Sequence, residues 1–349
     1  MNNPLITVLM PVFNAEKYLS ESIDSILNQS LNEFEFIIID DASTDLSVQI
    51  INSYTDRRIR FIQNQTNLGI SASLNKGIEM ASAELIARMD ADDISHIERL
   101  QKQYDFFIAN PDYALLSSRV QVILPDKTPV RVDHFKNRYY YYNLNFICWI
   151  YHSSVMYKRS AVIDVGKYSQ FYSEDFDLWW KISRKYKIHH MQEVLLDYRI
   201  TAESLSHVTK KEEYEIAQHK QVLRNIHYYT GKDYQLTYSE IECYRHNFEP
   251  LLQKNTTTAV LQCIKKLKYI SKRILYKENI NLDKKGVEEA FEYKKEFIIS
   301  FYAENLKGIR RFLFYIQTGY FLTFFIRIRD AILRRLFKIN LSDDEIESA

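Results

Sequence analysis

The chain has 349 residues, enough for about two domains of ordinary size. Apolar residues make up 46% of it and charged residues 26%, which excludes an intrinsically disordered chain. The 46 basic and 45 acidic side chains leave a net charge of +1, so no nucleic-acid partner bound through bulk charge is expected. The seven scattered glycines fit neither G-x-G-x-x-G nor G-x-x-x-x-G-K-[ST], which excludes both glycine-rich phosphate loops. A nucleotide-phosphate site would therefore need another device, such as a metal ion.

Cysteine usage and the first residues bear on the compartment. Cys148, Cys243 and Cys263 are odd in number and far apart, which disfavours a disulfide framework or a zinc site and is typical of a reducing compartment. The N-terminal stretch has no basic region before its apolar run, and Pro11 interrupts that run. We interpret it as a first strand and not as a signal peptide.

Short β-rich runs alternate with helical patterns over the first 130 residues. Strands are predicted at 5–10, 34–39, 59–63 and 85–89, with helices at 15–28, 46–54 and 70–81 between them. Such alternation is typical of the α/β class, with a mostly parallel sheet covered by helices on both faces.

The pattern changes further along the chain. A helix near 96–108 is followed by a hairpin with strands at 113–124 and 130–132, and another strand is predicted at 153–157. His189-His190 is assigned to a loop. Beyond residue 208, lysine-rich helical patterns dominate, with the clearest at 258–276. We therefore predict one domain at 1–208 and a helical C-terminal region at 209–349.

Acidic side chains follow two of the predicted strands. Asp41 comes at the end of the second, and Asp90, Asp92 and Asp93 come at the end of the fourth. Because ligands of an open parallel sheet bind beyond the carboxyl ends of its strands, these carboxylates mark a candidate site. Two acidic clusters at one edge suit a divalent cation with bound phosphates. The alternative is that these aspartates cap helices or solvate loops.

Four motifs occur in a familiar order. They are TVLMPVFN at 7–14, FEFIIIDD at 34–41 followed by Ser43 and Asp45, NLG at 67–69, and DADD at 90–93. Together they resemble glycosyltransferase family 2, whose members are inverting, nucleotide-sugar-dependent enzymes with the GT-A fold. The later pair Glu174-Asp175 resembles the acidic pair that supplies the catalytic base in this family. The resemblance covers roughly the first 200 residues.

The resemblance implies roles around the nucleotide. Pro11 and Phe13 would form a wall for the uracil base, and Asp41 would accept a hydrogen bond from the uracil imide N–H. Asn75 and Asp90 would border the nucleoside and ribose. The implied donor is a UDP-sugar.

The resemblance also implies a metal site. Asp92, in the D-x-D sequence that begins at Asp90, would hold Mn²⁺ or Mg²⁺ on the two phosphates, and His207 would be a distal ligand of the metal or the phosphates. His152 would lie near the donor or acceptor sugar, although a lone histidine is often structural. Arg88 fits either a phosphate contact or a structural ion pair, and the role of Asp93 is open.

The acidic pair begins an apolar helical pattern. Inverting transfer requires a general base for the acceptor hydroxyl, and we assign this role to Asp175, with Glu174 as the fallback. The helix N-terminus is expected to favour ionised carboxylates there. The alternative is a simple N-cap. Trp179 and Trp180 could stack on sugars, but neighbouring helical residues point in different directions, so at least one is expected in the core.

Two features found in some members of this family are missing from the sequence, and their absence bears on the kind of transfer. The sequence has no Q-x-x-R-W motif and no set of long apolar spans, which disfavours a processive synthase and favours transfer of a single sugar. The expected acceptor is a glycan or lipid-linked glycan of a surface polysaccharide such as lipopolysaccharide or capsule. A retaining transferase, a nucleotidyltransferase on a similar sheet, and a non-catalytic membrane-associated scaffold remain alternatives.

The tail at 308–339 combines aromatic and basic residues. Its apolar centre at 312–326 is shorter than the about 20 residues of a membrane-spanning helix, and arginines flank it. This pattern favours a helix that lies in the headgroup region of an anionic leaflet, on the inner face of the cell membrane. The alternative is a buried helix or a contact between subunits.

Overall fold

The computed structural model describes residues 4–132, 136–169, 172–201, 210–254 and 256–321. The chain forms two compact units. The first comprises Met1–Gln235 together with Arg273–Ala290, and the second comprises Leu236–Lys272 together with Phe291–Ala349. Helix α8 (Lys211–Thr230) belongs to the first unit, which therefore extends beyond the boundary predicted at residue 208.

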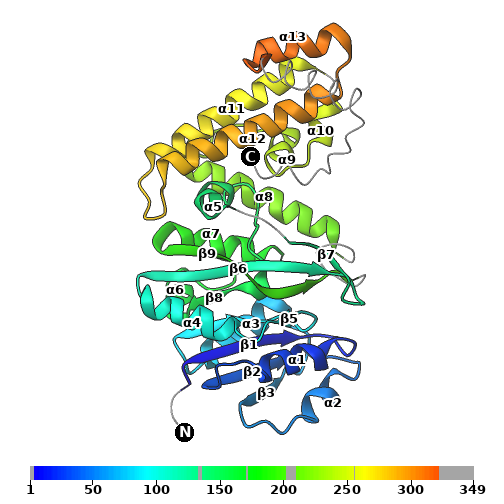
Figure 1. The fold of residues 1–349 in the computed structure, drawn as a ribbon, viewed down its shortest axis with the longest axis vertical. Helices are drawn as coiled ribbons and strands as arrows, with labels where there is room; N and C mark the ends of the chain where they lie inside the picture. Colours follow the sequence, from blue (N-terminus) through cyan, green and yellow to red (C-terminus); the bar gives the residue numbers. More distant parts are fainter. Residues whose placement is uncertain (1–3, 133–135, 170–171, 202–209, 255, 322–349) are drawn as a thin grey trace, which may run out of the picture. The chain divides into compact units, whose positions relative to one another are not determined.

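The first unit is built on one mixed sheet (Figure 1). Its parallel part has the order β3-β2-β1-β4. The bounds of these strands are β1 Ile6–Val12, β2 Phe34–Asp40, β3 Ile59–Gln63 and β4 Leu85–Arg88. The prediction of an α/β fold with four such strands is confirmed.

The rest of the sheet is mixed: β6 (Tyr113–Ile123) and β9 (Lys187–Arg199) pair in parallel, and the other pairs are antiparallel. The order continues from β4 through β8 (Met156–Lys158), β6, β9 and β5 (Ile94–Ser95), while β7 (Pro129–Val132) pairs with β6 as the predicted hairpin. The assignment of His189-His190 to a loop is wrong, because both lie in β9. A half-buried strand is predicted from alternating apolar and polar residues, and this strand has polar residues on both faces.

Strand β1 is buried on both faces. Ile6, Val8 and Met10 pack in one core cluster with residues of α1 (Leu19–Leu27). Leu9 points to the other side, toward α3 (Ile70–Met80), where a Cβ on Gly77 would lie 2.2 Å from Leu9 Cδ1. Only glycine at this position lets α3 pack so closely on the sheet.

The remaining helices of the first unit include α7 (Glu174–Lys185), whose C-terminal carbonyls are capped from residues far along the chain. Asn279 and Asn281 donate to the Ser183 carbonyl at 3.1 and 2.9 Å, and Asn281 also donates to the Tyr186 carbonyl at 2.7 Å. These groups would otherwise lack partners at the helix end. The other bounds are α2 Ser47–Asn52, α4 Arg99–Ala109, α5 Tyr140–Asn143, α6 Arg159–Asp164, and the short 3₁₀ turns Asn137–Tyr139 and His152–Ser154.

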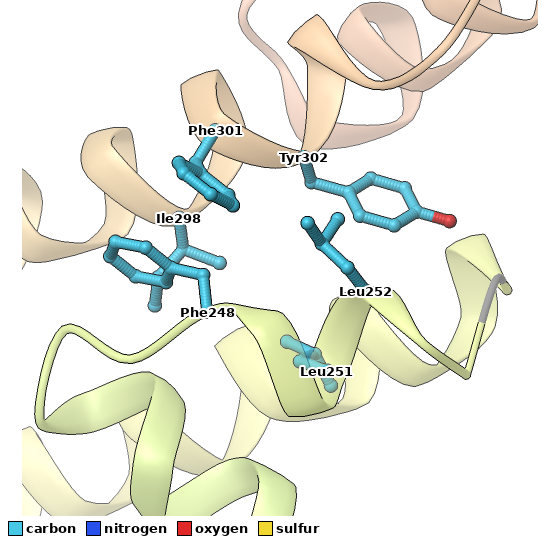
Figure 2. Close-up of a pocket in the computed structure, with 6 residues that line it drawn as sticks. All are labelled: Phe248, Leu251, Leu252, Ile298, Phe301 and Tyr302. Atoms are coloured by element: carbon cyan, nitrogen blue, oxygen red, sulfur yellow. The ribbon is translucent and has the colours of Figure 1, made fainter.

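The second unit is helical, as predicted. Its elements are α9 Tyr238–Tyr244, α10 Glu249–Leu252, α13 Gly308–Thr318, and most of α11 (Thr257–Tyr276) and α12 (Lys284–Glu304). A small apolar pocket is lined by Phe248, Leu251, Leu252, Ile298, Phe301 and Tyr302 (Figure 2). Its cavity volume of about 10 Å³ has room for one water molecule at most, so it is a packing defect and not a ligand site.

Helix α13 covers the first part of the predicted basic-aromatic tail. It ends at Thr318, and Gly319 follows with a left-handed φ of 79°. The apolar stretch at 312–326 is therefore not one helix through Gly319, and its part beyond residue 321 lies outside the described residues. Within the described part of the chain, every helix is too short or too polar to cross a bilayer.

Candidate active site

The loops after β1 and β2 are tied together at the carboxyl edge of the sheet. Asn14, with a left-handed φ of 48°, donates its backbone N–H to Ser43 Oγ at 2.9 Å. Its side-chain oxygen accepts the Thr44 backbone N–H at 2.8 Å. The side chain of Phe13 is 49% exposed beside this junction, while Pro11 is half-buried in β1. An exposed aromatic ring at this edge fits the predicted wall for a nucleotide base.

Asp41 holds the NLG motif in place. Its carboxylate accepts hydrogen bonds from Asn64 Nδ2 at 2.8 Å, from Leu68 N at 3.0 Å and from Gly69 N at 2.8 Å. A carboxylate has about four acceptor positions. Three internal donors leave room for one more, so the predicted contact with a base N–H and this structural role can coexist.

Asn75 has a structural role that the sequence did not indicate. Its Nδ2 donates to the Tyr168 carbonyl at 2.8 Å, and its Oδ1 accepts the Tyr168 backbone N–H at 3.1 Å. The side-chain amide thus clamps a loop segment onto α3. Its predicted place at the nucleoside stays a prediction.

The acidic run after β4 is held by a network from distant segments. Arg88 is buried and forms an ion pair with Asp90. Of the two roles considered for this arginine, a phosphate contact or a structural ion pair, the structure shows the ion pair. Ser153 Oγ donates to Asp90 Oδ2 at 2.7 Å and also to Asp93. Asp93 accepts the Arg199 backbone N–H at 2.8 Å and is fully buried. Asp93 therefore anchors the run to β9.

Asp92 differs from Asp90 and Asp93, whose carboxylates accept hydrogen bonds from Ser153. Its backbone carbonyl accepts Arg199 Nε at 2.8 Å, which fixes the main chain. Burial, and next the charge of Asp90, raise the pKa of the Asp92 carboxyl to about 7. Crowded carboxylates of this kind are relieved by a bound cation.

The residues present fit a metal ion whose coordination sphere is completed by the substrate. Among the described residues, no group of three or more His, Cys, Asp or Glu side chains is arranged to hold a metal ion. Mg²⁺ and Mn²⁺ take one or two carboxylates together with substrate phosphates and water, so the Asp92 carboxylate fits such a site without a complete set of protein ligands. His207, the predicted distal ligand, lies outside the described residues.

The acidic pair opens α7 without capping it. The N-cap is Ser173, in a left-handed conformation, and Asp175 Oδ1 accepts the Phe176 backbone N–H at 2.7 Å. Burial raises the pKa of Glu174 to about 8 and that of Asp175 to about 6. The expectation that the helix N-terminus keeps both carboxylates readily ionised is wrong, because burial outweighs a dipole effect of about 1 kcal/mol.

The two acidic motifs lie close together. Ser153 donates to Asp90 at 2.7 Å, and the adjacent His152 lies 3.8 Å from Glu174. The charge of Asp90 contributes to raising the pKa of both Glu174 and Asp175, and Arg88 lowers the pKa of both. Residues 84 positions apart are thus brought within electrostatic range, as the motif order predicts.

Two nearby side chains carried no signal in the sequence. Burial, and next the charges of Glu174 and Asp175, raise the pKa of Tyr214 on α8. Burial and the same two carboxylates also raise the pKa of the Cys148 thiol. Tyr214 lies beyond the motifs and beyond the predicted domain, so only the fold places it here.

The two tryptophans differ in burial. Trp179 is fully buried, which excludes it from stacking on a sugar and confirms that one of the pair is core. Trp180 is half-buried, and its Nε1 donates to Asn145 Oδ1 at 3.1 Å.

His152 lies between two other groups of the site. Its Nε2 is 2.8 Å from the Tyr168 hydroxyl, and its Nδ1 is 3.8 Å from Glu174 Oε1. Burial lowers the pKa of the imidazole well below its usual value, so the ring is neutral.

Comparisons with known proteins show the family of this chain. The model of glycosyl transferase family 2 matches residues 7–170. An uncharacterized glycosyltransferase of Haemophilus influenzae is 30% identical over 329 residues, covering 89% of this chain and 97% of the relative. The O-antigen biosynthesis glycosyltransferase WbnJ of Escherichia coli is 28% identical over 272 residues, covering 74% and 94%.

A solved structure shows the same fold. TarS 1–349 of S. aureus, crystallised with UDP-GlcNAc, superposes with a TM-score of 0.53 at 17% identity, covering 85% of this chain and 89% of TarS. Sheet, acidic motifs and relatives define a nucleotide-sugar type of α/β fold, the GT-A fold. The chain belongs to glycosyltransferase family 2.

Proposed function

We propose that this enzyme transfers one sugar from a UDP-sugar to a hydroxyl group of a glycan or lipid-linked glycan, with inversion, in the synthesis of a surface polysaccharide. The observation that carries the proposal is that the DADD run lies close to Glu174-Asp175: Ser153 donates to Asp90 at 2.7 Å, and the adjacent His152 lies 3.8 Å from Glu174. The names of WbnJ and the UDP-GlcNAc complex of TarS support the pathway and the donor.

The donor would be held at the edge of the parallel strands. Phe13 and Pro11 would contact the base, Asp41 would accept its imide N–H, and Asp90 would border the ribose. Asp92 would hold Mn²⁺ or Mg²⁺. The cation supplies positive charge for the diphosphate as it leaves.

The acceptor would react from the opposite face of the sugar. Attack by a hydroxyl on the anomeric carbon inverts its configuration, and the hydroxyl proton must move to a base as the bond forms. The resemblance gives this role to the acidic pair, and burial raises the pKa of Asp175 to about 6, close to the pH at which a general base works best. We therefore assign the base to Asp175.

The first prediction tests the donor site. Calorimetric titration of the protein with UDP in the presence of Mn²⁺ or Mg²⁺ is expected to show a dissociation constant for UDP that is millimolar or lower. EDTA is expected to abolish this binding. Uridine is the control, because without phosphates its binding has no reason to depend on the metal. Absence of UDP binding at millimolar concentration would refute the donor assignment.

Transfer separates an enzyme from a scaffold. A panel of nucleotide sugars is offered with lipid-linked glycans of the source cell, and a metal-dependent product is expected for one UDP-sugar. A protein that binds UDP with metal but forms no product with any pair would be the non-catalytic scaffold instead.

We also propose that α13 rests on an anionic membrane surface. Ile309, Leu313 and Ile316 lie along one face of the helix and are 68%, 49% and 49% exposed. From 307 to 321 the sequence has three basic residues (Lys307, Arg310 and Arg311) and no acidic ones. Exposed aliphatic groups flanked by basic residues suit anionic headgroups, and this placement would bring the enzyme to a lipid-linked acceptor.

The second prediction tests this face. The double variant Ile309→Ser/Leu313→Ser is expected to bind vesicles that contain phosphatidylglycerol at least roughly tenfold more weakly than wild type at low salt, because each inserted side chain contributes about 2 kcal/mol. Sedimentation with vesicles measures it. Ile108→Ser is the control, since Ile108 is 62% exposed on α4 of the other unit. If the full-length wild-type protein does not bind anionic vesicles, the proposal is contradicted.

A further inference from the structure

A chain of contacts runs from α3 to the acidic pair. Asn75 on α3 clamps the backbone of Tyr168 through both atoms of its amide, at 2.8 and 3.1 Å. The Tyr168 hydroxyl lies 2.8 Å from His152 Nε2, and His152 Nδ1 lies 3.8 Å from Glu174 Oε1. The four residues come from separate segments, so the fold and not the local sequence assembles this chain.

The histidine has little freedom to turn. Its ring contacts Tyr168 and Trp179, with ring centroids 5.5 and 5.6 Å away. Only 10% of its side chain is exposed. A neutral imidazole has one N–H donor and one acceptor nitrogen, and the partner of one nitrogen fixes the state of the other. When the Tyr168 hydroxyl donates to Nε2, the proton of the neutral ring lies on Nδ1, the nitrogen that faces Glu174.

Glu174 has an unused oxygen. The residue is 4% exposed, and within the described structure its Oε2 is buried without a hydrogen-bond partner. A buried polar atom without a partner costs about 1–3 kcal/mol, so native proteins rarely keep one without a use. The neighbouring Asp175 is the proposed base. An acceptor hydroxyl that approaches Asp175 would be the natural partner for this oxygen.

We propose that Glu174 Oε2 binds the acceptor hydroxyl beside Asp175, and that His152, oriented by Tyr168, positions Glu174 for this contact. The inference rests on the proposed transferase function and names how its acceptor is held. It makes His152 and Tyr168 positioning residues, in place of the direct sugar contact that the resemblance implies for His152. The clamp by Asn75 links this arrangement to the helix on the donor side.

Tyr168→Phe tests the chain because it removes only the hydroxyl. We expect kcat/KM for the acceptor to fall about tenfold, as is typical when a reacting group is misplaced, while the Kd for UDP stays within about twofold. Tyr141→Phe is the matched control. It also removes a buried hydroxyl, whose partners are Tyr229 at 3.3 Å and Arg184 at 3.4 Å, and should leave acceptor kinetics within about twofold.

A measurement without catalysis complements the kinetics. In full-length wild-type protein, the ¹⁵N spectrum of His152 is expected to show one neutral tautomer, and Tyr168→Phe is expected to give a mixture. A wild-type mixture would overturn the proposal even if no acceptor had been found. Equal losses of acceptor kcat/KM in Tyr168→Phe and Tyr141→Phe would also overturn it.

Two further outcomes are distinguishable. If Tyr168→Phe or His152→Gln weakens UDP as much as transfer, His152 acts on the donor and the inference fails while the transferase function stands. If wild type forms no product but His152 keeps its single tautomer, the proposed function fails and the positioning contact stands. Glu174→Gln, which keeps a polar atom at Oε2, should raise the acceptor KM more than it changes the Kd for UDP.

Discussion

Replacing Asp175 with asparagine is expected to lower sugar transfer by at least about 10²-fold, while UDP affinity stays near that of wild type. The amide cannot accept the proton of the acceptor hydroxyl, but it keeps the size of the side chain. In wild type, Asp175 is protonated below its pKa of about 6, so kcat should rise as pH increases through that value. The asparagine variant should lose this dependence. Steady-state kinetics between about pH 5 and 8, with UDP titrations alongside, measure both effects.

The same helix provides a control for Asp175. Asp177→Asn removes a carboxylate that is paired with Lys181 at 2.6 Å, and we expect transfer to stay within a few-fold of wild type. If Asp175→Asn stays active, Glu174 is the base. If Asp177→Asn abolishes transfer as fully as Asp175→Asn, the loss reflects damage to α7 and not removal of a base.

Replacing Asp92 with asparagine should produce the second large loss, about 10²-fold at low metal concentration. A neutral amide binds a divalent cation much more weakly than a carboxylate, so the diphosphate would leave with less compensating charge. Raising the Mn²⁺ concentration should restore part of the activity. The experiment measures turnover as a function of metal concentration in wild type and variant.

A distant aspartate serves as the control for Asp92. Asp105→Asn changes the charge by the same amount on an exposed side chain that accepts a hydrogen bond from Gln101 Nε2 at 2.9 Å, and its metal dependence should match wild type. If Asp92→Asn and Asp175→Asn lose UDP affinity equally, the metal and base roles have been misassigned.

The parallel strands and their acidic ends were predictable because the signals are local. Apolar runs such as residues 34–39 show a buried strand by themselves, and the aspartates follow directly in sequence. The start of strand β9 was not predicted, because its polar residues obscure the alternation of apolar and polar positions. Asp93 could not be interpreted, since its partners Ser153 and Arg199 lie 60 and 106 residues away.

Charge states were harder to predict than positions. The start of α7 was located correctly at Glu174, but the sequence offers only the helix dipole as a guide to ionisation. The burial that raises the pKa of Glu174 depends on segments packed around it. Likewise, the double use of Asp41 as a loop anchor becomes visible only when Leu68 and Gly69 turn their N–H groups toward it.

The asparagine caps on α7 limit how such enzymes can exchange parts in evolution. Residues 273–290 return to the first unit, and Asn279 and Asn281 bond to carbonyls at the far end of the helix that begins with Glu174. A recombination event that replaced everything after residue 235 with the sequence of a relative would also replace these caps. A working chimera must therefore inherit this short return segment together with the first unit, so the second unit cannot be exchanged at a single crossover point.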